Sequence, residues 1–297
     1  MVFSFLTFAA SWLLWAAAFR LAGGDFTHPS RFTALGGALY LLGVFAPALV
    51  AIVLTALRDG GDRVRTLLRR VIAWDVGPRY YVFAILFYPV ARLAGAAVER
   101  IVLGVWPGAS SESLGVMLVA TVLSAPIQAG EEVGWRGFLL PRLSARLGLP
   151  LASLVVGVVW AAWHLPFFFM PGTDKTGQPF PAYVAGLTAL SVAMAWLYWR
   201  TRGSLLLAML MHAAVNNLRP MATPPVAAGS PFALRGPLMT WSAIGCMWIA
   251  AAGLLFTMRG VRDLPGNSRR STLAQIPCSV RTWLNRVVRR SIDILYR

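Results

Sequence analysis

Eight apolar runs constrain this chain more than any other feature. A bilayer core of about 30 Å needs roughly 20 apolar residues in a helix, because each residue advances the helix by about 1.5 Å. Hydrophobic residues make up 58% of the 297 residues and charged residues only 13%, whereas soluble domains carry about 25% charged residues. The sequence therefore predicts an all-α, polytopic integral membrane protein with about eight transmembrane helices. The runs lie at about 2–22, 35–57, 80–98, 115–141, 150–170, 182–200, 203–219 and 238–258.

These runs divide the chain into four parts. Residues 1–114 hold transmembrane helices 1–3, and residues 115–220 form a core that carries the polar groups discussed below. Residues 221–258 hold the last transmembrane helix, and residues 259–297 form a basic tail. The first run has no basic segment before it and is long for a signal peptide, so we expect a retained helix.

The basic residues predict the orientation of the helices. The net charge is +16, which in a soluble protein would suggest nucleic acid. Here the segments 58–79, the end of the fourth run to about 149, 200–202 and 259–297 hold 20 of the 27 Arg and Lys residues. Such residues concentrate in cytoplasmic loops. We therefore expect both termini in the cytoplasm and no nucleic-acid partner. We also expect the membrane to be a bacterial plasma membrane, which the charge pattern itself does not show.

The basic tail has the pattern of an amphipathic helix. Its apolar residues fall at helical spacing over 280–297, and most of its arginines take the other side. This pattern is typical of a helix that lies on a membrane surface and binds anionic lipid. The segment RTLLRRVIAW at 65–74 has the same character.

One polar stretch, AGEEVGWRGFLLP at 129–141, interrupts the fourth apolar run. On a helix, Glu132 and Arg136 are four residues apart, in the favourable order for an ion pair. Glu131 points about 100° away and has no local partner, so it could serve as a general base. In the alternative interpretation the helix ends near Gly130 and both glutamates lie in water. The apolar residues 138–140 argue against that.

Two histidines supply further candidates. His164 follows Trp160 by one turn in the fifth run, and His212 precedes Asn216 by four residues near the end of the seventh. A His and Asn pair on one face can donate two hydrogen bonds to an oxyanion. Each histidine could instead be a hydrogen-bonded core residue or join two helices.

Together these groups make a plausible hydrolytic site at the middle or cytoplasmic half of the membrane. The spacing excludes a zinc motif of the His-Glu-x-x-His type on one helix.

In these three motifs the chain resembles the CPBP or ABI family, the CAAX proteases and bacteriocin-processing or immunity proteins of the membrane. Glu131, Glu132 and Arg136 are similar to its Glu-Glu-x-x-x-Arg motif. Trp160 and His164 are similar to Phe-x-x-x-His, with Trp in place of Phe, and His212 and Asn216 to His-x-x-x-Asn. The likeness covers about 115–220, a little over a third of the chain.

The resemblance implies a membrane-embedded peptidase that cuts a peptide or a lipidated protein. In it Glu131 and His164 would activate a water and His212 and Asn216 would stabilise the oxyanion, with Glu132, Arg136 and Trp160 in support. Members are often described as metalloproteases, and Glu131, His164 and His212 could hold a zinc ion with an open position. A non-enzymatic transporter or immunity scaffold is the alternative, although no internal repeat typical of transporters is present.

Overall fold

The computed structural model describes residues 1–28, 33–108, 111–219, 231–233 and 237–265. It contains helices and no β-strand within these ranges, so the prediction of an all-α membrane protein is confirmed. Seven helical segments of the described residues are long and apolar enough to cross a membrane, and the seventh of the eight expected runs, at 203–219, is a shorter apolar helix, α10 (Leu205–Leu218). The seven are α1 (Val2–Leu21), α2 (Ala34–Asp59), α4 (Pro78–Leu103), the segment Leu114–Leu147, the segment Leu149–Phe169, α9 (Phe180–Arg200) and α11 (Leu238–Thr257).

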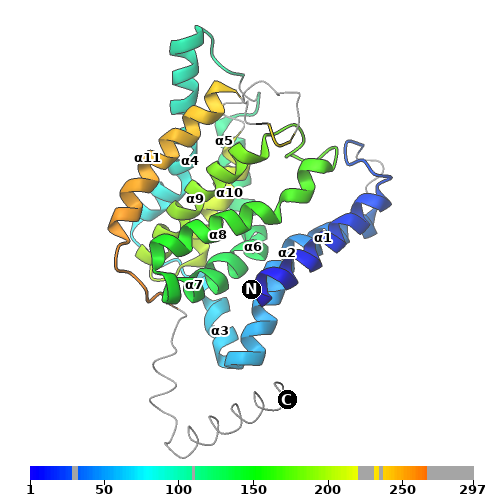
Figure 1. Ribbon diagram of the computed structural model, residues 1–297, viewed down its shortest axis with the longest axis vertical. Coiled ribbons are helices and arrows are strands. Elements are labelled where there is room, and N and C mark those ends of the chain that lie inside the picture. Colours follow the sequence, from blue (N-terminus) through cyan, green and yellow to red (C-terminus); the bar gives the residue numbers. More distant parts are fainter. Residues whose placement is uncertain (29–32, 109–110, 220–230, 234–236, 266–297) are drawn as a thin grey trace, which may run out of the picture.

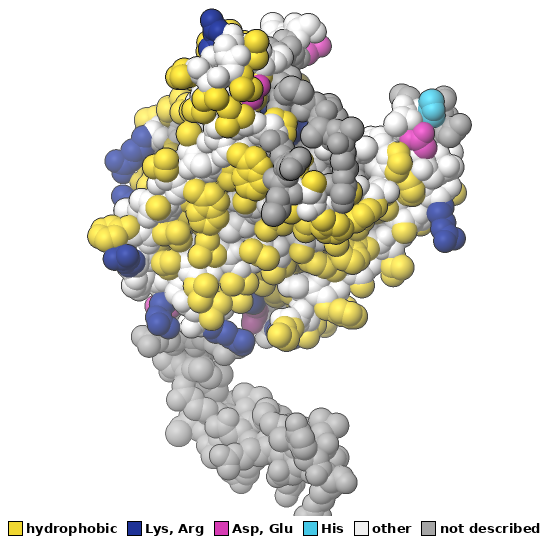
Figure 2. Space-filling model, turned by 45° about the horizontal axis from the view of Figure 1, so that its top comes forward, with side chains coloured by type: hydrophobic (Ala, Val, Ile, Leu, Met, Phe, Trp, Pro, Cys, Tyr) yellow, Lys and Arg dark blue, Asp and Glu magenta, His cyan; other side chains and the backbone are white. Residues whose placement is uncertain are grey.

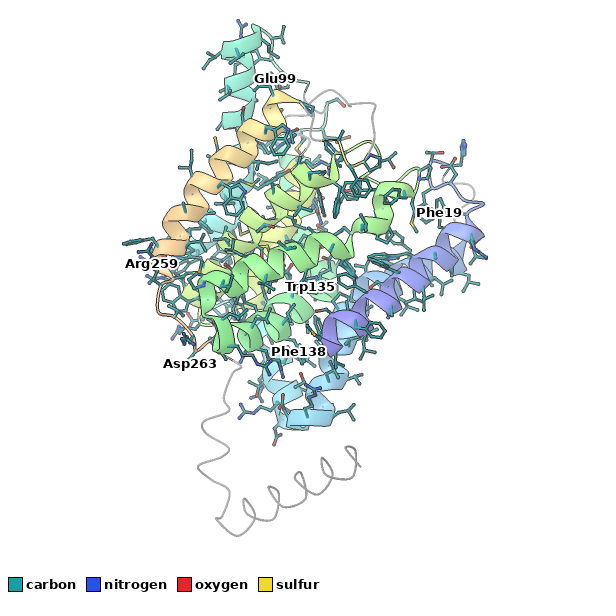
Figure 3. All side chains as sticks on the ribbon, in the orientation of Figure 1. Phe19, Glu99, Trp135, Phe138, Arg259 and Asp263 are labelled. Carbon is teal, nitrogen blue, oxygen red and sulfur yellow. The ribbon has the colours of Figure 1, made fainter. Side chains whose placement is uncertain are left out.

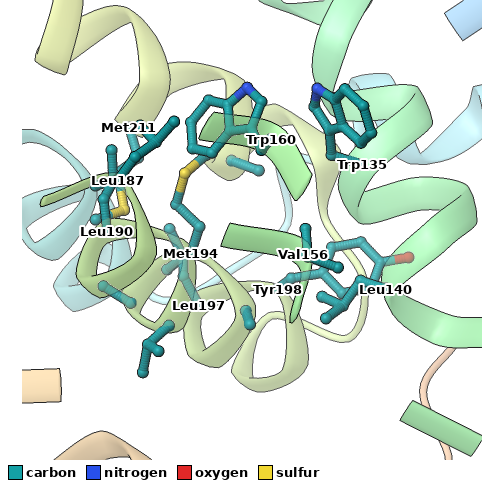
Figure 4. Close-up of a cluster of buried hydrophobic side chains, with 14 of the residues drawn as sticks. Trp135, Leu140, Val156, Trp160, Leu187, Leu190, Met194, Leu197, Tyr198 and Met211 are labelled. Carbon is teal, nitrogen blue, oxygen red and sulfur yellow. The ribbon is translucent and has the colours of Figure 1, made fainter. Parts of the chain in front are cut away.

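The helices form a bundle around α9 and α10, with α1 and α2 as an antiparallel pair on one side (Figure 1). Ser11 joins that pair to the bundle: its hydroxyl donates to the carbonyl of Gly43 at 2.8 Å and accepts from the Trp163 indole at 2.8 Å. Figure 4 shows the buried side chains between α8 (Leu149–Trp163) and α9, including Trp160 and Met194. Hydrophobic side chains also cover much of the outer face, which suits contact with lipid (Figure 2).

The fourth span differs from the uniform helix expected over 115–141. Its winding changes four times along 34 residues: α5 (Leu114–Ser124), a 3₁₀ turn (Ala125–Gln128), α6 (Ala129–Glu132), a π-helix (Val133–Leu139) and α7 (Leu140–Leu147). Pro126 lies in the 3₁₀ turn, where it cannot donate a backbone hydrogen bond. Short π-helical turns occur mostly within α-helices and frequently at functional sites.

The π-helix packs tightly on its neighbours. A Cβ atom on Gly134 would lie 2.6 Å from Cβ of Pro47 and 2.7 Å from its carbonyl oxygen, so only glycine fits there. Trp135 and Phe138 point toward the start of α1 (Figure 3), where Phe3 packs with ring centroids 5.6 and 5.0 Å away. The polar stretch is therefore held inside the bundle, and the alternative of a helix that ends near Gly130 is wrong.

Helix α3 (Gly61–Arg69) lies at one end of the bundle (Figure 1), and this helix and the turn Arg70–Ile72 that follows it are rich in arginine. Arg70 donates to the Tyr198 hydroxyl at 2.8 Å and to the carbonyl of Pro265 at 2.6 Å. Arg142 pairs with Asp59 at 2.7 Å. These contacts hold the ends of four spans together at this end of the bundle. We call it the arginine end. The surface helix expected over 280–297 lies outside the described residues.

Candidate active site

A cavity of about 580 Å³ lies inside the bundle, among residues of α2, α4, α6, α8, α9, α10 and α11. Glu131, His164, His212 and Asn216 all line it. The structure thus brings together the four side chains that the three motifs single out, from segments up to 85 residues apart in the sequence.

Glu131 is an acidic residue that lines this cavity, and it is only 6% exposed. The Trp160 indole N–H donates to its Oε2 at 2.6 Å, while its Oε1 lies 4.0 Å from Nε2 of His212. Hydrogen bonds to a charged acceptor are short and strong. Trp160 therefore fixes one carboxylate oxygen and leaves the other facing His212.

Glu132 contacts two partners through one oxygen. Its Oε1 accepts from Nη1 of Arg136 at 3.0 Å, the pair expected from the i, i+4 spacing, and lies 2.8 Å from Nδ1 of His212. The side chains of Glu132 and Arg136 are completely buried. Glu132 thus links its own helix to α10, a contact that the sequence does not indicate.

Arg136 also packs face-on against Trp160, with its guanidinium carbon 4.1 Å from the ring centroid. An arginine over an indole ring is attracted by the negative face of the ring. This residue was counted among the cytoplasmic basic residues in the sequence. Since it is buried in the core, it does not contribute to the charge of the arginine end.

His164 ends α8, and its Nδ1 lies 2.9 Å from the carbonyl oxygen of Trp160. A carbonyl oxygen only accepts, so Nδ1 carries the proton and Nε2 of the neutral ring keeps its lone pair. The described contacts include no direct hydrogen bond between His164 and Glu131.

Asn216 lies one turn beyond His212 on α10, at a more exposed position of the cavity wall. Its amide donates to Oε1 of Gln128 at 3.5 Å, at the outer limit of a hydrogen bond. Gln128 lines the cavity but was not singled out in the sequence. It precedes Glu131 by three residues in an apolar run, and that isolated polar side chain is the signal that could have identified it.

A second group of polar residues, Asp174, Lys175 and Arg219, lines the opening of the cavity, which we call its mouth. Asp174 Oδ2 lies 2.5 Å from Nζ of Lys175 and 3.4 Å from Nη1 of Arg219. Burial lowers the pKa of the Lys175 ammonium, Asp174 raises it, and Arg219 lowers it. Burial raises the pKa of Asp174, but the neighbouring cations outweigh this and hold it below its ordinary value. Asp174, Lys175 and Arg219 have no role among the sequence-based expectations.

The mouth of the cavity lies at the end of the bundle opposite the arginine end. Its exposed lining residues include Thr176 and Gly177, in the loop between His164 and α9. α9 runs from this loop to Arg200, which lies close to the arginine end. The site was expected at the middle or cytoplasmic half of the membrane, but His164 and Asn216 are nearer the other end of their helices.

The side chains do not fit a three-ligand zinc site as they are arranged. Within the described ranges no three His, Cys, Asp or Glu side chains form a group that could hold a metal ion. Catalytic zinc takes three protein ligands and one open position.

Comparison with known proteins agrees with the motifs. Residues 111–218 match a family model described as type II CAAX prenyl endopeptidase Rce1-like. A curated relative from Methanococcus maripaludis, named CAAX prenyl protease 2, is 21% identical over 225 residues, which are 71% of this chain and 80% of the relative. Neither description mentions a metal or bacteriocin immunity. These findings confirm the resemblance of this chain to the CPBP family of intramembrane proteases.

Proposed function

We propose that this protein is an intramembrane endopeptidase that hydrolyses a peptide bond in a membrane-associated or lipidated protein. The name of its relative, CAAX prenyl protease 2, supports this proposal. The observation that carries this proposal is the convergence of a buried carboxylate and two imidazoles on one cavity inside membrane-spanning helices. Ionisable groups at such depth mark functional sites.

Glu131 and His164 activate the attacking water. Oε1 of Glu131 faces the cavity because Trp160 occupies the other oxygen. Nε2 of His164 keeps a lone pair because Nδ1 donates to the Trp160 carbonyl. Two acceptors on one cavity can share the protons of a water, and a positioned general base contributes about 10²–10⁴-fold to a rate.

His212 and Asn216 stabilise the negative charge that develops on the carbonyl oxygen of the substrate. Nδ1 of His212 contacts Oε1 of Glu132, which holds the ring in place. Nε2 is then the ring nitrogen left to face the oxygen of the substrate, on the side of Glu131. The weakly held amide of Asn216 is the second donor. Removing one oxyanion donor costs about 10²–10³-fold in kcat.

Glu132 and Arg136 hold this arrangement in place. Their buried pair fixes the position of Glu132, which in turn fixes the ring of His212 through Nδ1. The two adjacent glutamates therefore have different roles: Glu131 faces the substrate and Glu132 faces the protein.

The walls of the cavity suit a lipid-bearing substrate. Apolar side chains of three helices, α2, α9 and α11, line it beside the catalytic groups: Leu41, Val44, Leu187, Leu190, Ile244 and Met247. Burial of a hydrocarbon chain against such side chains contributes about 0.8 kcal/mol per methylene. A lipid attached to the substrate would thus hold its peptide at the site.

The test is cleavage of a lipidated peptide by purified protein in nanodiscs, with mass spectrometry of the products. We expect wild type and Glu112→Gln, which changes an exposed acidic residue outside the cavity, to cut the peptide at one bond. Glu131→Gln should remain folded and lose cleavage. Cleavage by folded Glu131→Gln at the wild-type rate would contradict the proposed role.

A further inference from the structure

Gln128 is a buried polar residue of the cavity wall, beside the groups that act on the substrate. It ends the 3₁₀ turn Ala125–Gln128 in an otherwise apolar span and is only 7% exposed. A polar group inside membrane-spanning helices is costly unless it forms hydrogen bonds. The side chain of Gln128 contacts the carbonyl of Ser124 and the side-chain amide of Asn216. Gln128 therefore connects the turn before Glu131 directly to α10.

The backbone determines which way the amide of Gln128 faces. Its Nε2 lies 3.4 Å from the carbonyl oxygen of Ser124. A carbonyl oxygen only accepts, so the NH₂ group of Gln128 faces Ser124 and its Oε1 faces α10. That oxygen lies 3.5 Å from Nδ2 of Asn216 and can only accept as well. Asn216 therefore turns its NH₂ group, and not its Oδ1, toward Gln128.

The neighbouring Asn217 holds this end of α10 against the same turn. Its Nδ2 donates to the hydroxyl of Ser124 at 2.8 Å and to the carbonyl of Ala213 at 2.8 Å. Ser124 thus accepts from Asn217 through its hydroxyl and from Gln128 through its carbonyl. The two short bonds of Asn217 fix the spacing between the turn and α10, across which the longer contact of Gln128 is made.

We propose that Gln128 is a positioning residue for Asn216. This inference rests on the proposed function, in which Asn216 donates a hydrogen bond to the carbonyl oxygen of the substrate. An amide NH₂ group carries two hydrogens. Gln128 accepts one of them, leaves the other for the substrate, and keeps the acceptor oxygen of Asn216 away from the developing negative charge. Donors that are oriented before the reaction stabilise a transition state without the cost of turning during it.

The experiment measures kcat and KM for cleavage of a lipidated peptide in nanodiscs by wild type, Gln128→Met, Asn216→Ala and the double variant. Methionine keeps the length of glutamine without its amide. We expect Gln128→Met to lower kcat about tenfold and leave KM within about twofold, because the oriented donor acts on the transition state. In the Asn216→Ala background the same change should lower kcat by less than about twofold, since residues that act together are not additive.

Thr121→Val is the matched control. Thr121 also donates to a backbone carbonyl four residues earlier in the same span, that of Met117, but it lies outside the cavity lining. We expect this variant to cleave at the wild-type rate.

A second measurement needs no substrate. The chain holds four asparagines, so protein labelled with ¹⁵N-asparagine gives four side-chain amide signals in an NMR spectrum, and Asn216→Ala identifies that of Asn216. Gln128→Met should shift this signal, whereas Thr121→Val should leave it in place.

An unshifted Asn216 signal in Gln128→Met would overturn the positioning role, as would an equal loss of kcat with and without Asn216. The two measurements separate this role from the proposed function. If the signal shifts but wild type cuts no peptide, the peptidase fails and the hold of Gln128 on Asn216 stands. If wild type and Gln128→Met cut the peptide at the same rate, the peptidase stands and the positioning role fails.

Discussion

Replacing Trp160 by phenylalanine tests the indole hydrogen bond to Glu131 most directly. Phenylalanine keeps an aromatic ring for Arg136 to pack on but lacks the N–H that donates to Glu131 at 2.6 Å. A hydrogen bond to a charged group contributes about 1.5–3 kcal/mol. If the whole bond is needed in the transition state, its loss lowers kcat/KM by roughly 10- to 150-fold, since about 1.4 kcal/mol corresponds to tenfold.

The assay is steady-state cleavage of a lipidated peptide in nanodiscs, with thermal stability measured on the same samples. Trp135→Phe is the matched control, because Trp135 is as deeply buried and its indole nitrogen has no hydrogen-bond partner among the residues that the structure describes. We expect Trp135→Phe to cleave at close to the wild-type rate. A folded Trp160→Phe variant with kcat/KM within about twofold of Trp135→Phe would refute the positioning of Glu131 by this bond.

Three further predictions concern stability and orientation. Glu132→Gln should lower the yield and thermal stability of the folded protein, because breaking a buried ion pair costs about 3–5 kcal/mol. Glu131→Gln should lower neither, and the reverse pattern would show that the roles of the two glutamates are exchanged. Gly134→Ala should lower the free energy of unfolding by about 1–3 kcal/mol, because the added methyl group has no room. Gly245→Ala, with no atom within 4 Å of the new carbon, should leave the free energy of unfolding unchanged, and equal stabilities of the two variants would contradict the close packing of Gly134. Reporter fusions should place the C-terminal tail in the cytoplasm and the loop at 171–181 outside it; a cytoplasmic signal from that loop would reverse the orientation.

Hydropathy predicts the spans of this chain well, because contact with lipid demands long apolar segments. It does not report the winding of a helix, so the changes from 3₁₀ to α to π across residues 125–139 were not expected. Those changes accompany close packing, such as that of Gly134 against α2.

The motifs likewise predict which residues meet but not how they bond. The i, i+4 rule places Arg136 beside Glu132, since both lie on one helix. The contact between Glu132 and His212 joins residues 80 positions apart, and only the packing of α10 on α6 creates it. Trp160 was interpreted as a substitute for another aromatic ring, whereas its polar N–H, which phenylalanine lacks, contacts Glu131.

The opposite placement of the cavity mouth and the arginine end decides where a substrate has to be. Arginine-rich loops stay on the cytoplasmic side during insertion, and in that orientation the mouth between His164 and α9 faces the other compartment. A protein that never leaves the cytoplasm would then be separated from Glu131 by the packed core. In that orientation the peptides within reach would be those already delivered across the membrane, and export would precede cleavage.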